Sequence, residues 1–244
     1  MLNEQTSTTS QTRQQKANKA GMWAAIVVTL IPILSACMTL GTLYGGMFYN
    51  QFGSRGLLLM MNFFDYGQSA LSLLWALVFA VLMACLYSFA PAEKRKWLQV
   101  GLILALTYLL LLIFNYLISF APNFRFTFLE RIFPALESRF RPWAFGTLIY
   151  TLMGLAALFA IPAFTRGGLE RAIRWCLGIS GVLLIACGVV WIFSPGAQIN
   201  AMLSLATFLI RITIFPLTTA MIAVAFWRMT KIQPAENVSL PTTG

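Results

Sequence analysis

A stripe of polar residues follows one face of the last long apolar segment, and it includes the segment's one charged residue. At about 100° per residue on an α-helix, its members fall within about 60° of one another. They are Asn200, Ser204, Thr207, Arg211 and Thr218. A guanidinium at the centre of a bilayer costs about 2.5 to 3.5 kcal/mol, so it requires acceptors or a polar cavity. Its planar fork suits a carboxylate or a phosphate.

Few other polar residues are expected at the depth of Arg211. Asp65 lies at the outer end of one apolar segment, and Asn115 shares a helical face with Tyr108 on another. The predicted polar pocket therefore comprises Arg211, Thr207, Ser204, Thr218, Asn115, Tyr108 and Asp65. Two alternatives are that Arg211 forms a structural ion pair and that its long side chain extends to the outer headgroups.

Composition indicates the class of protein that carries this stripe. Of the 244 residues, 59% are hydrophobic and 10% are charged, whereas a soluble domain has about 25% charged residues. A helix needs about 20 apolar residues to cross a bilayer. Six segments qualify, at about 22–48, 67–90, 97–121, 143–164, 175–193 and 201–227. We therefore predict an all-α, polytopic transmembrane helix bundle of six spans, forming one domain over residues 20–228.

Polar tails flank this domain, and we expect residues 1–19 and 229–244 to be disordered, because they lack an apolar face.

The distribution of basic residues predicts the orientation of the chain in the membrane. With the N-terminus inside, eleven basic residues lie in inner segments and five in outer segments. The positive-inside rule then predicts that both termini lie on the cytoplasmic side of a cell membrane, such as a bacterial inner membrane. Five residues at the span ends support these boundaries as an aromatic belt: Trp23, Trp97, Trp143, Trp175 and Trp227.

One motif competes with the first span. Leu34-Ser35-Ala36-Cys37 follows a basic segment and an apolar run, and it resembles a lipoprotein cleavage site. The apolar run continues to Tyr49, which favours a spanning helix over a signal peptide.

Two outer segments are also unusual. Residues 56–64 predict an interfacial or re-entrant helix, and residues 123–141 predict an amphipathic lid or gate.

Small residues predict where the helices pack, since close approach drives helix association in lipid. One seam has a four-residue step: Ser72, Ala76, Ala80, Ala84 and Ser88. Further packing seams are predicted at glycines of the fourth and fifth spans: Gly146, Gly154, Gly181 and Gly188. Pro32 and Pro216 fall inside the first and last spans and predict kinks.

Several chemistries are excluded or unsupported. The chain has no His, which removes His-ligated metals, Ser-His catalysis and His proton relays. No paired carboxylates and no C-x-x-C motif occur, so we expect no catalytic residues, no metal and no cofactor. The net charge of +10 lies in loops without a run of five basic residues, so nucleic acid is not an expected partner.

Three functional hypotheses follow. The first is a non-enzymatic carrier or binding module for a small-molecule or anionic solute at the Arg211 stripe. The second is a structural or assembly subunit that binds a membrane-protein partner through its small-residue ridges. The third, a membrane-embedded enzyme, is the least favoured because the usual catalytic groups are missing. In all three the lipid bilayer is the principal partner.

Overall fold

The computed structural model describes residues 2–52, 55–120, 142–164, 167–193 and 197–236. These residues form helices. The helices are α1 (Leu2–Phe52), α2 (Arg55–Phe89), η1 (Ala92–Lys94), α3 (Arg95–Phe120), α5 (Pro142–Ala160), η3 (Ile161–Ala163), α6 (Gly168–Phe193), α7 (Ala197–Ile212) and α8 (Ile214–Glu236). The predicted all-α class is confirmed for this part of the chain.

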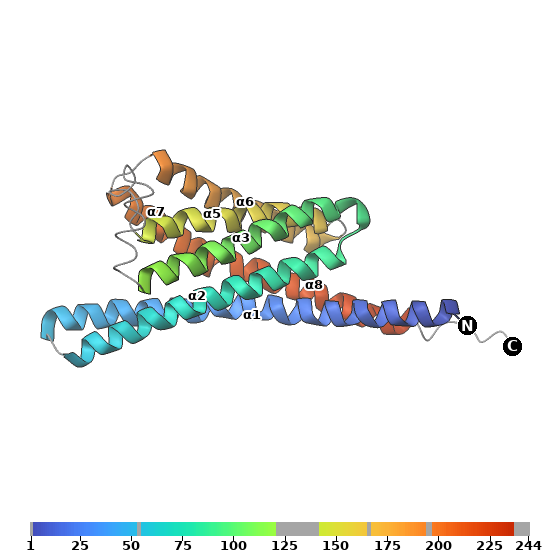
Figure 1. Cartoon of the computed structure of the whole chain (residues 1–244), viewed down its shortest axis with the longest axis horizontal. Helices are drawn as coiled ribbons and strands as arrows, with labels where there is room; N and C mark the ends of the chain where they lie inside the picture. Colours follow the sequence, from blue (N-terminus) through green and yellow to red (C-terminus); the bar gives the residue numbers. More distant parts are fainter. Residues whose placement is uncertain (1, 53–54, 121–141, 165–166, 194–196, 237–244) are drawn as a thin grey trace.

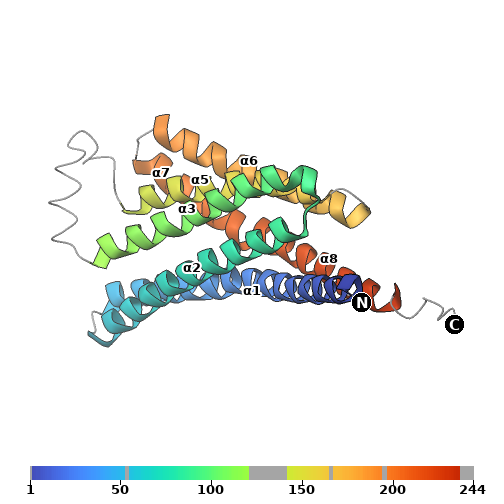
Figure 2. The same ribbon diagram turned by 45° about the vertical axis from the view of Figure 1, so that its right-hand side comes forward.

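The helices lie roughly side by side in one bundle (Figure 1; Figure 2). We call one end of the bundle the termini end, because both chain ends and the α2–α3 and α5–α6 connections lie there. The opposite end, where α1 turns back into α2, is the hairpin end. α1 packs against α2 and α8, and α5 packs against α3 and α6.

Five helical segments of the described chain are long and apolar enough to cross a membrane. They are Gln15–Gly41, Tyr66–Phe89, Ala92–Leu117, Gly168–Val190 and Leu205–Lys231. A shorter apolar stretch, Ile149–Ala163, corresponds to the span predicted at 143–164. Many large apolar side chains, such as Leu110, Leu117 and Leu205, face outward. An apolar exterior is what a bundle surrounded by lipid requires, so the chain is a multi-pass membrane protein.

The long helices extend beyond the predicted boundaries. α1 includes residues 3–19 and α8 reaches Glu236, although we expected disorder in both regions. No Gly or Pro interrupts α1 before Gly21, and adding residues to an existing helix costs little. Asn18 is also buried. Residues 237–244 and the predicted lid at 123–141 lie outside the described residues.

We expected a separate interfacial or re-entrant helix at residues 56–64, and this expectation is wrong. These residues are the first part of α2, which continues without interruption to Phe89. α1 reaches Phe52 beside it, so the two helices pair along their length and project past the other helices at the hairpin end (Figure 1). The antiparallel packing against α1 explains why α2 is helical beyond its apolar span.

Glycines bring α5 and α6 into close contact. A Cβ added at Gly181 would lie 2.8 Å from the Gly154 carbonyl oxygen, and one added at Gly154 would lie 2.9 Å from the Gly181 carbonyl oxygen. At Gly188, the hydroxyl of Thr151 occupies the space that a Cβ would need. The seam predicted at Gly154, Gly181 and Gly188 is therefore confirmed.

The small-residue ridge of α2 is buried over only part of its length. Ser72, Ala76 and Ala80 are buried, Ala84 is half-buried and Ser88 is exposed. Close packing by this ridge is therefore concentrated in its first three members, from the middle of α2 toward Ala80.

Pro216 divides the predicted last span into two helices. Proline has no N–H to offer the carbonyl of Ile212 and its ring crowds that carbonyl. α7 therefore ends at Ile212, and α8 begins at Ile214 after the turn residue Thr213. Arg211 consequently lies in the last turn of α7, five residues before Pro216.

The glycine seam gives a matched test within one helix. We expect Gly181→Ala to destabilise the protein by about 1 to 3 kcal/mol, because its methyl group would overlap Leu158 and the Gly154 carbonyl. Gly178→Ala should be neutral or stabilising, since its added methyl group would lie 3.8 Å from the Ile161 side chain, an ordinary van der Waals contact. Unfolding in mixed detergent micelles would compare the two variants, and equal stabilities would contradict the seam.

Candidate functional site

Arg211 is buried in the bundle beside two aromatic rings. Its side chain is 9% exposed. The guanidinium carbon lies 4.3 Å from the ring centroid of Tyr150 on α5 and 4.9 Å from that of Trp75 on α2. A cation–π contact contributes about 0.5 to 2 kcal/mol, more when it is desolvated. Two such contacts are comparable in size with the cost of placing an arginine inside a membrane.

The Trp75 ring is held by a hydrogen bond to the backbone of α1. The indole Nε1 donates to the Val28 carbonyl at 3.2 Å. That carbonyl lies four residues before Pro32, which has no N–H to donate, so the proline leaves an acceptor free inside α1. Trp75 is fully buried and makes an edge contact with Phe215 of α8 at 5.6 Å. The proline in α1 therefore supplies the acceptor that orients one of the two rings around Arg211.

Tyr108 of α3 completes the aromatic group. Its ring lies 5.8 Å from that of Tyr150 and 6.3 Å from that of Phe79. The Tyr108 hydroxyl is a neighbour of Tyr150, but it has no partner of acceptable hydrogen-bond geometry among the described residues. The Nε of Arg211 also lacks a partner there. Buried polar atoms normally have one, so these two groups retain unused hydrogen-bonding capacity.

A polar row continues from this group toward the hairpin end. Ser72 lies one turn from Trp75 along α2, and Ser69 lies one turn further. The Tyr116 hydroxyl on α3 is a neighbour of both serine side chains. Polar side chains of α2 and α3 therefore face each other between the level of Arg211 and the hairpin end.

The arrangement of the guanidinium determines what it can bind. Its N–H donors lie in one plane, and the Nε edge of that plane has no partner among the described residues. That edge suits the two oxygens of a carboxylate or a phosphate. No cluster of three or more potential metal ligands occurs among the described residues.

The predicted pocket residues have different positions in the structure. Tyr108 joins the Arg211 group. Thr207 and Thr218 are buried, but their hydroxyls donate to backbone carbonyls of Leu203 and Ile214 at 2.8 and 2.7 Å. The hydroxyl protons of these two threonines are therefore already hydrogen-bonded to the backbone of their own helices. The buried position of Arg211 also differs from the alternative in which it extends to the headgroups.

For the remaining pocket residues the structure gives positions along their helices. Asn115 is half-buried on α3, two turns from Tyr108 toward the hairpin end. Asp65 lies ten residues before Trp75 on α2, about 15 Å along the helix axis. The side chains of Asp65 and Ser204 lie outside the described residues.

Sequence reasoning missed Trp75, Tyr150 and Tyr116 as neighbours of this site. One signal was present for Trp75. The tryptophans of the aromatic belt lie at span ends, whereas Trp75 lies well inside its span. A tryptophan at that depth is away from the interface that its polar N–H prefers, so it indicates a buried partner.

The fold and the buried arginine define a multi-pass helical membrane protein with a cationic, aromatic-lined centre. Comparison with protein-family models, with curated proteins and with solved structures finds no match. The residues of this chain therefore carry the functional argument.

A double-mutant cycle tests the link between Pro32 and Trp75. We expect Trp75→Phe to cost about 1 to 3 kcal/mol in unfolding free energy, because it leaves the buried Val28 carbonyl without a donor. In a Pro32→Ala background the same change should cost less, since the new N–H of residue 32 can satisfy that carbonyl. Unfolding in mixed micelles measures both costs, and strictly additive effects would contradict the link.

Proposed function

We propose that this multi-pass membrane protein binds a small solute through one anionic group at Arg211, without catalysing a reaction on it. The observation that carries the proposal is a guanidinium that is 9% exposed, lies beside two aromatic rings and has an Nε without a partner among the described residues. A carboxylate or a phosphate monoester or diester has the geometry to occupy its edge.

The distribution of acidic side chains supports this reading. Two of the described side chains are acidic, Glu93 and Glu170. Glu93 is in η1 and Glu170 is in the first turn of α6, so both lie at the termini end of the bundle. Neither is placed to neutralise Arg211 at the level of Trp75 and Tyr150. An anionic ligand would supply the opposite charge that a buried cation normally requires.

The polar row suggests the direction of entry. Ser72, Tyr116 and Ser69 extend from the Arg211 level toward the hairpin end. The excess of basic residues in segments at the other end favours a cytoplasmic location for both termini. We therefore propose that the solute enters from the non-cytoplasmic side, as it would for uptake or for binding of an external solute.

A second candidate is a structural or assembly subunit, and the α1–α2 hairpin favours it. The apolar span of α1 ends at Gly41 and that of α2 begins at Tyr66, yet the helices continue to Phe52 and from Arg55. The eleven residues after Gly41 add about 16 Å of helix. A helical hairpin of that length offers a docking surface for a membrane-protein partner. A chain that co-purifies in mild detergent and is lost when residues 42–65 are deleted would support this candidate.

Anion binding to the purified protein tests the first proposal. We would measure calorimetrically the binding of acetate, benzoate and inorganic phosphate to the wild type. We expect one of these probes to bind, and Arg211→Gln to weaken it more than about ten-fold, because removal of one partner of a buried charge pair is costly. Arg174→Gln is the matched control, since Arg174 also has a buried Nε without a partner but lies near the termini end.

The contrary results separate the two functions. If no probe stabilises or binds the wild type, or if Arg211→Gln and Arg174→Gln weaken binding equally, the anion-binding proposal is wrong. If Arg211→Gln prevents folding while Arg211→Lys restores it without any probe binding, the role of Arg211 is structural.

A further inference from the structure

Four helices each carry an exposed tryptophan at the termini end. Trp23 of α1, Trp97 of α3, Trp175 of α6 and Trp227 of α8 are 61%, 55%, 67% and 46% exposed. Trp75, in the interior, is 0% exposed. Each of the four lies four to eight residues inside the end of its candidate span. An indole at that depth lies at the boundary between hydrocarbon and headgroups.

A basic residue lies one helical turn beyond each of these tryptophans. The spacing is four residues in three cases and three residues in α3. The pairs are Lys19 with Trp23, Lys94 with Trp97, Arg171 with Trp175 and Trp227 with Lys231. α1, α3 and α6 begin at the termini end and α8 ends there, so in every pair the cation is the outer member. One turn corresponds to about 5 Å, which places the cation in the headgroup layer above its indole.

The pair in α8 shows how the two groups fit together. The Lys231 ammonium lies 4.1 Å from the centroid of the Trp227 ring. Such a lysine packs its apolar stem on the ring, and two or more of its N–H donors remain available to solvent or headgroups. By contrast, Arg95 donates its Nε to the Ala90 carbonyl at 3.3 Å, so it helps to cap the end of α2.

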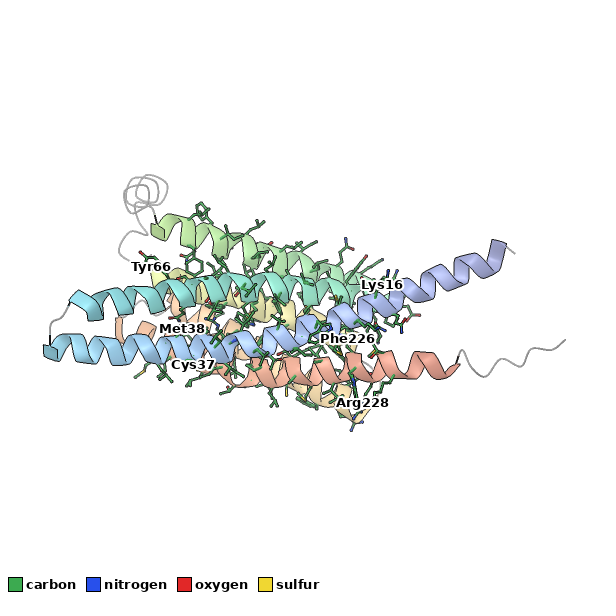
Figure 3. The ribbon with its side chains drawn as sticks, turned by 90° about the horizontal axis from the view of Figure 1, so that it is seen from below. Lys16, Cys37, Met38, Tyr66, Phe226 and Arg228 are labelled. Carbon is green, nitrogen blue, oxygen red and sulfur yellow. The ribbon has the colours of Figure 1, made fainter. Side chains whose placement is uncertain are left out.

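The termini end is strongly electropositive. Its described side chains include nine basic residues and two acidic ones. The basic residues are Lys16, Lys19, Lys94, Arg95, Lys96, Arg171, Arg174, Arg228 and Lys231, and the acidic residues are Glu93 and Glu170. Figure 3 shows Lys16 on α1 and Arg228 on α8 toward this end, beyond the point where Phe226 packs against α1. An excess of cations at a membrane surface attracts anionic lipid.

We propose that the four tryptophan–cation pairs are binding sites for the phosphates of anionic phospholipids, which form an ordered shell around the termini end. Each indole contacts the glycerol and upper acyl region, and its cation binds the phosphate one turn further out. The sites use exposed residues on the lipid-facing side and are independent of the buried Arg211.

Lipid selectivity measured in bilayers tests the pairing. Full-length protein is reconstituted in phosphatidylcholine with nitroxide-labelled phosphatidylglycerol or phosphatidylcholine, and the association of each label is measured by electron paramagnetic resonance. The paired variant is K19Q/R171Q/K231Q. The matched control is K16Q/K96Q/R228Q, which removes the same charge from exposed residues at the same end.

We expect wild-type protein to prefer phosphatidylglycerol and the paired variant to lose about five-fold in association at each altered site. The control should keep its preference within about two-fold. A second variant, W23L/W175L/W227L, retains every charge and should also weaken the preference. Gel filtration and circular dichroism would show that all variants are folded.

Two results would overturn the proposal. Equal losses in the paired and control variants would mean that diffuse charge, and not the pairs, attracts lipid. An unchanged preference in the tryptophan variant would mean that the indoles take no part in binding.

Discussion

The indole of Trp75 makes the contact on which the interior of this protein depends. Its N–H satisfies the Val28 carbonyl of α1, its ring face meets the Arg211 guanidinium of α7, and its edge meets Phe215 of α8. One side chain of α2 thus joins three other helical segments. Inside a membrane no bulk water is available to satisfy a free carbonyl or to solvate a cation, so these contacts matter more than they would in a soluble protein.

Two prolines set the geometry around that contact, with different local results. Pro32 leaves α1 continuous because Trp75 satisfies the freed carbonyl, whereas Pro216 divides α7 from α8. A hydrogen bond of 2.8 Å between the hydroxyls of Thr29 and Thr219 joins α1 to α8. Each threonine lies three residues from one of the prolines. The irregular parts of the two helices are therefore fastened to each other inside the bundle, where backbone irregularity is tolerated.

Aromatic rings are the recurrent partners of cations in this chain. The Arg211 guanidinium lies against the rings of Trp75 and Tyr150 in the interior, and the Lys231 ammonium lies over Trp227 at the surface. The sequence has 17 Lys and Arg residues, seven Asp and Glu residues and no His. With so few carboxylates, ring faces stabilise the positive charge while leaving its hydrogen-bond donors for other groups. In the interior we assign those donors to a solute anion, and at the termini end to lipid phosphates.

The sequence by itself determined the membrane class, the approximate spans, the role of Gly154, Gly181 and Gly188 as packing positions and the exceptional position of Arg211. These features depend on local hydropathy and on residue size, which can be read along one segment. Only the tertiary structure decided that Trp75 and Tyr150 surround Arg211 and that α1 and α2 continue past their apolar spans. It also separated Asp65 from the Trp75 level. Which helices are neighbours depends on the combined packing of all of them, because lipid is as apolar as their side chains and hydropathy does not select partners.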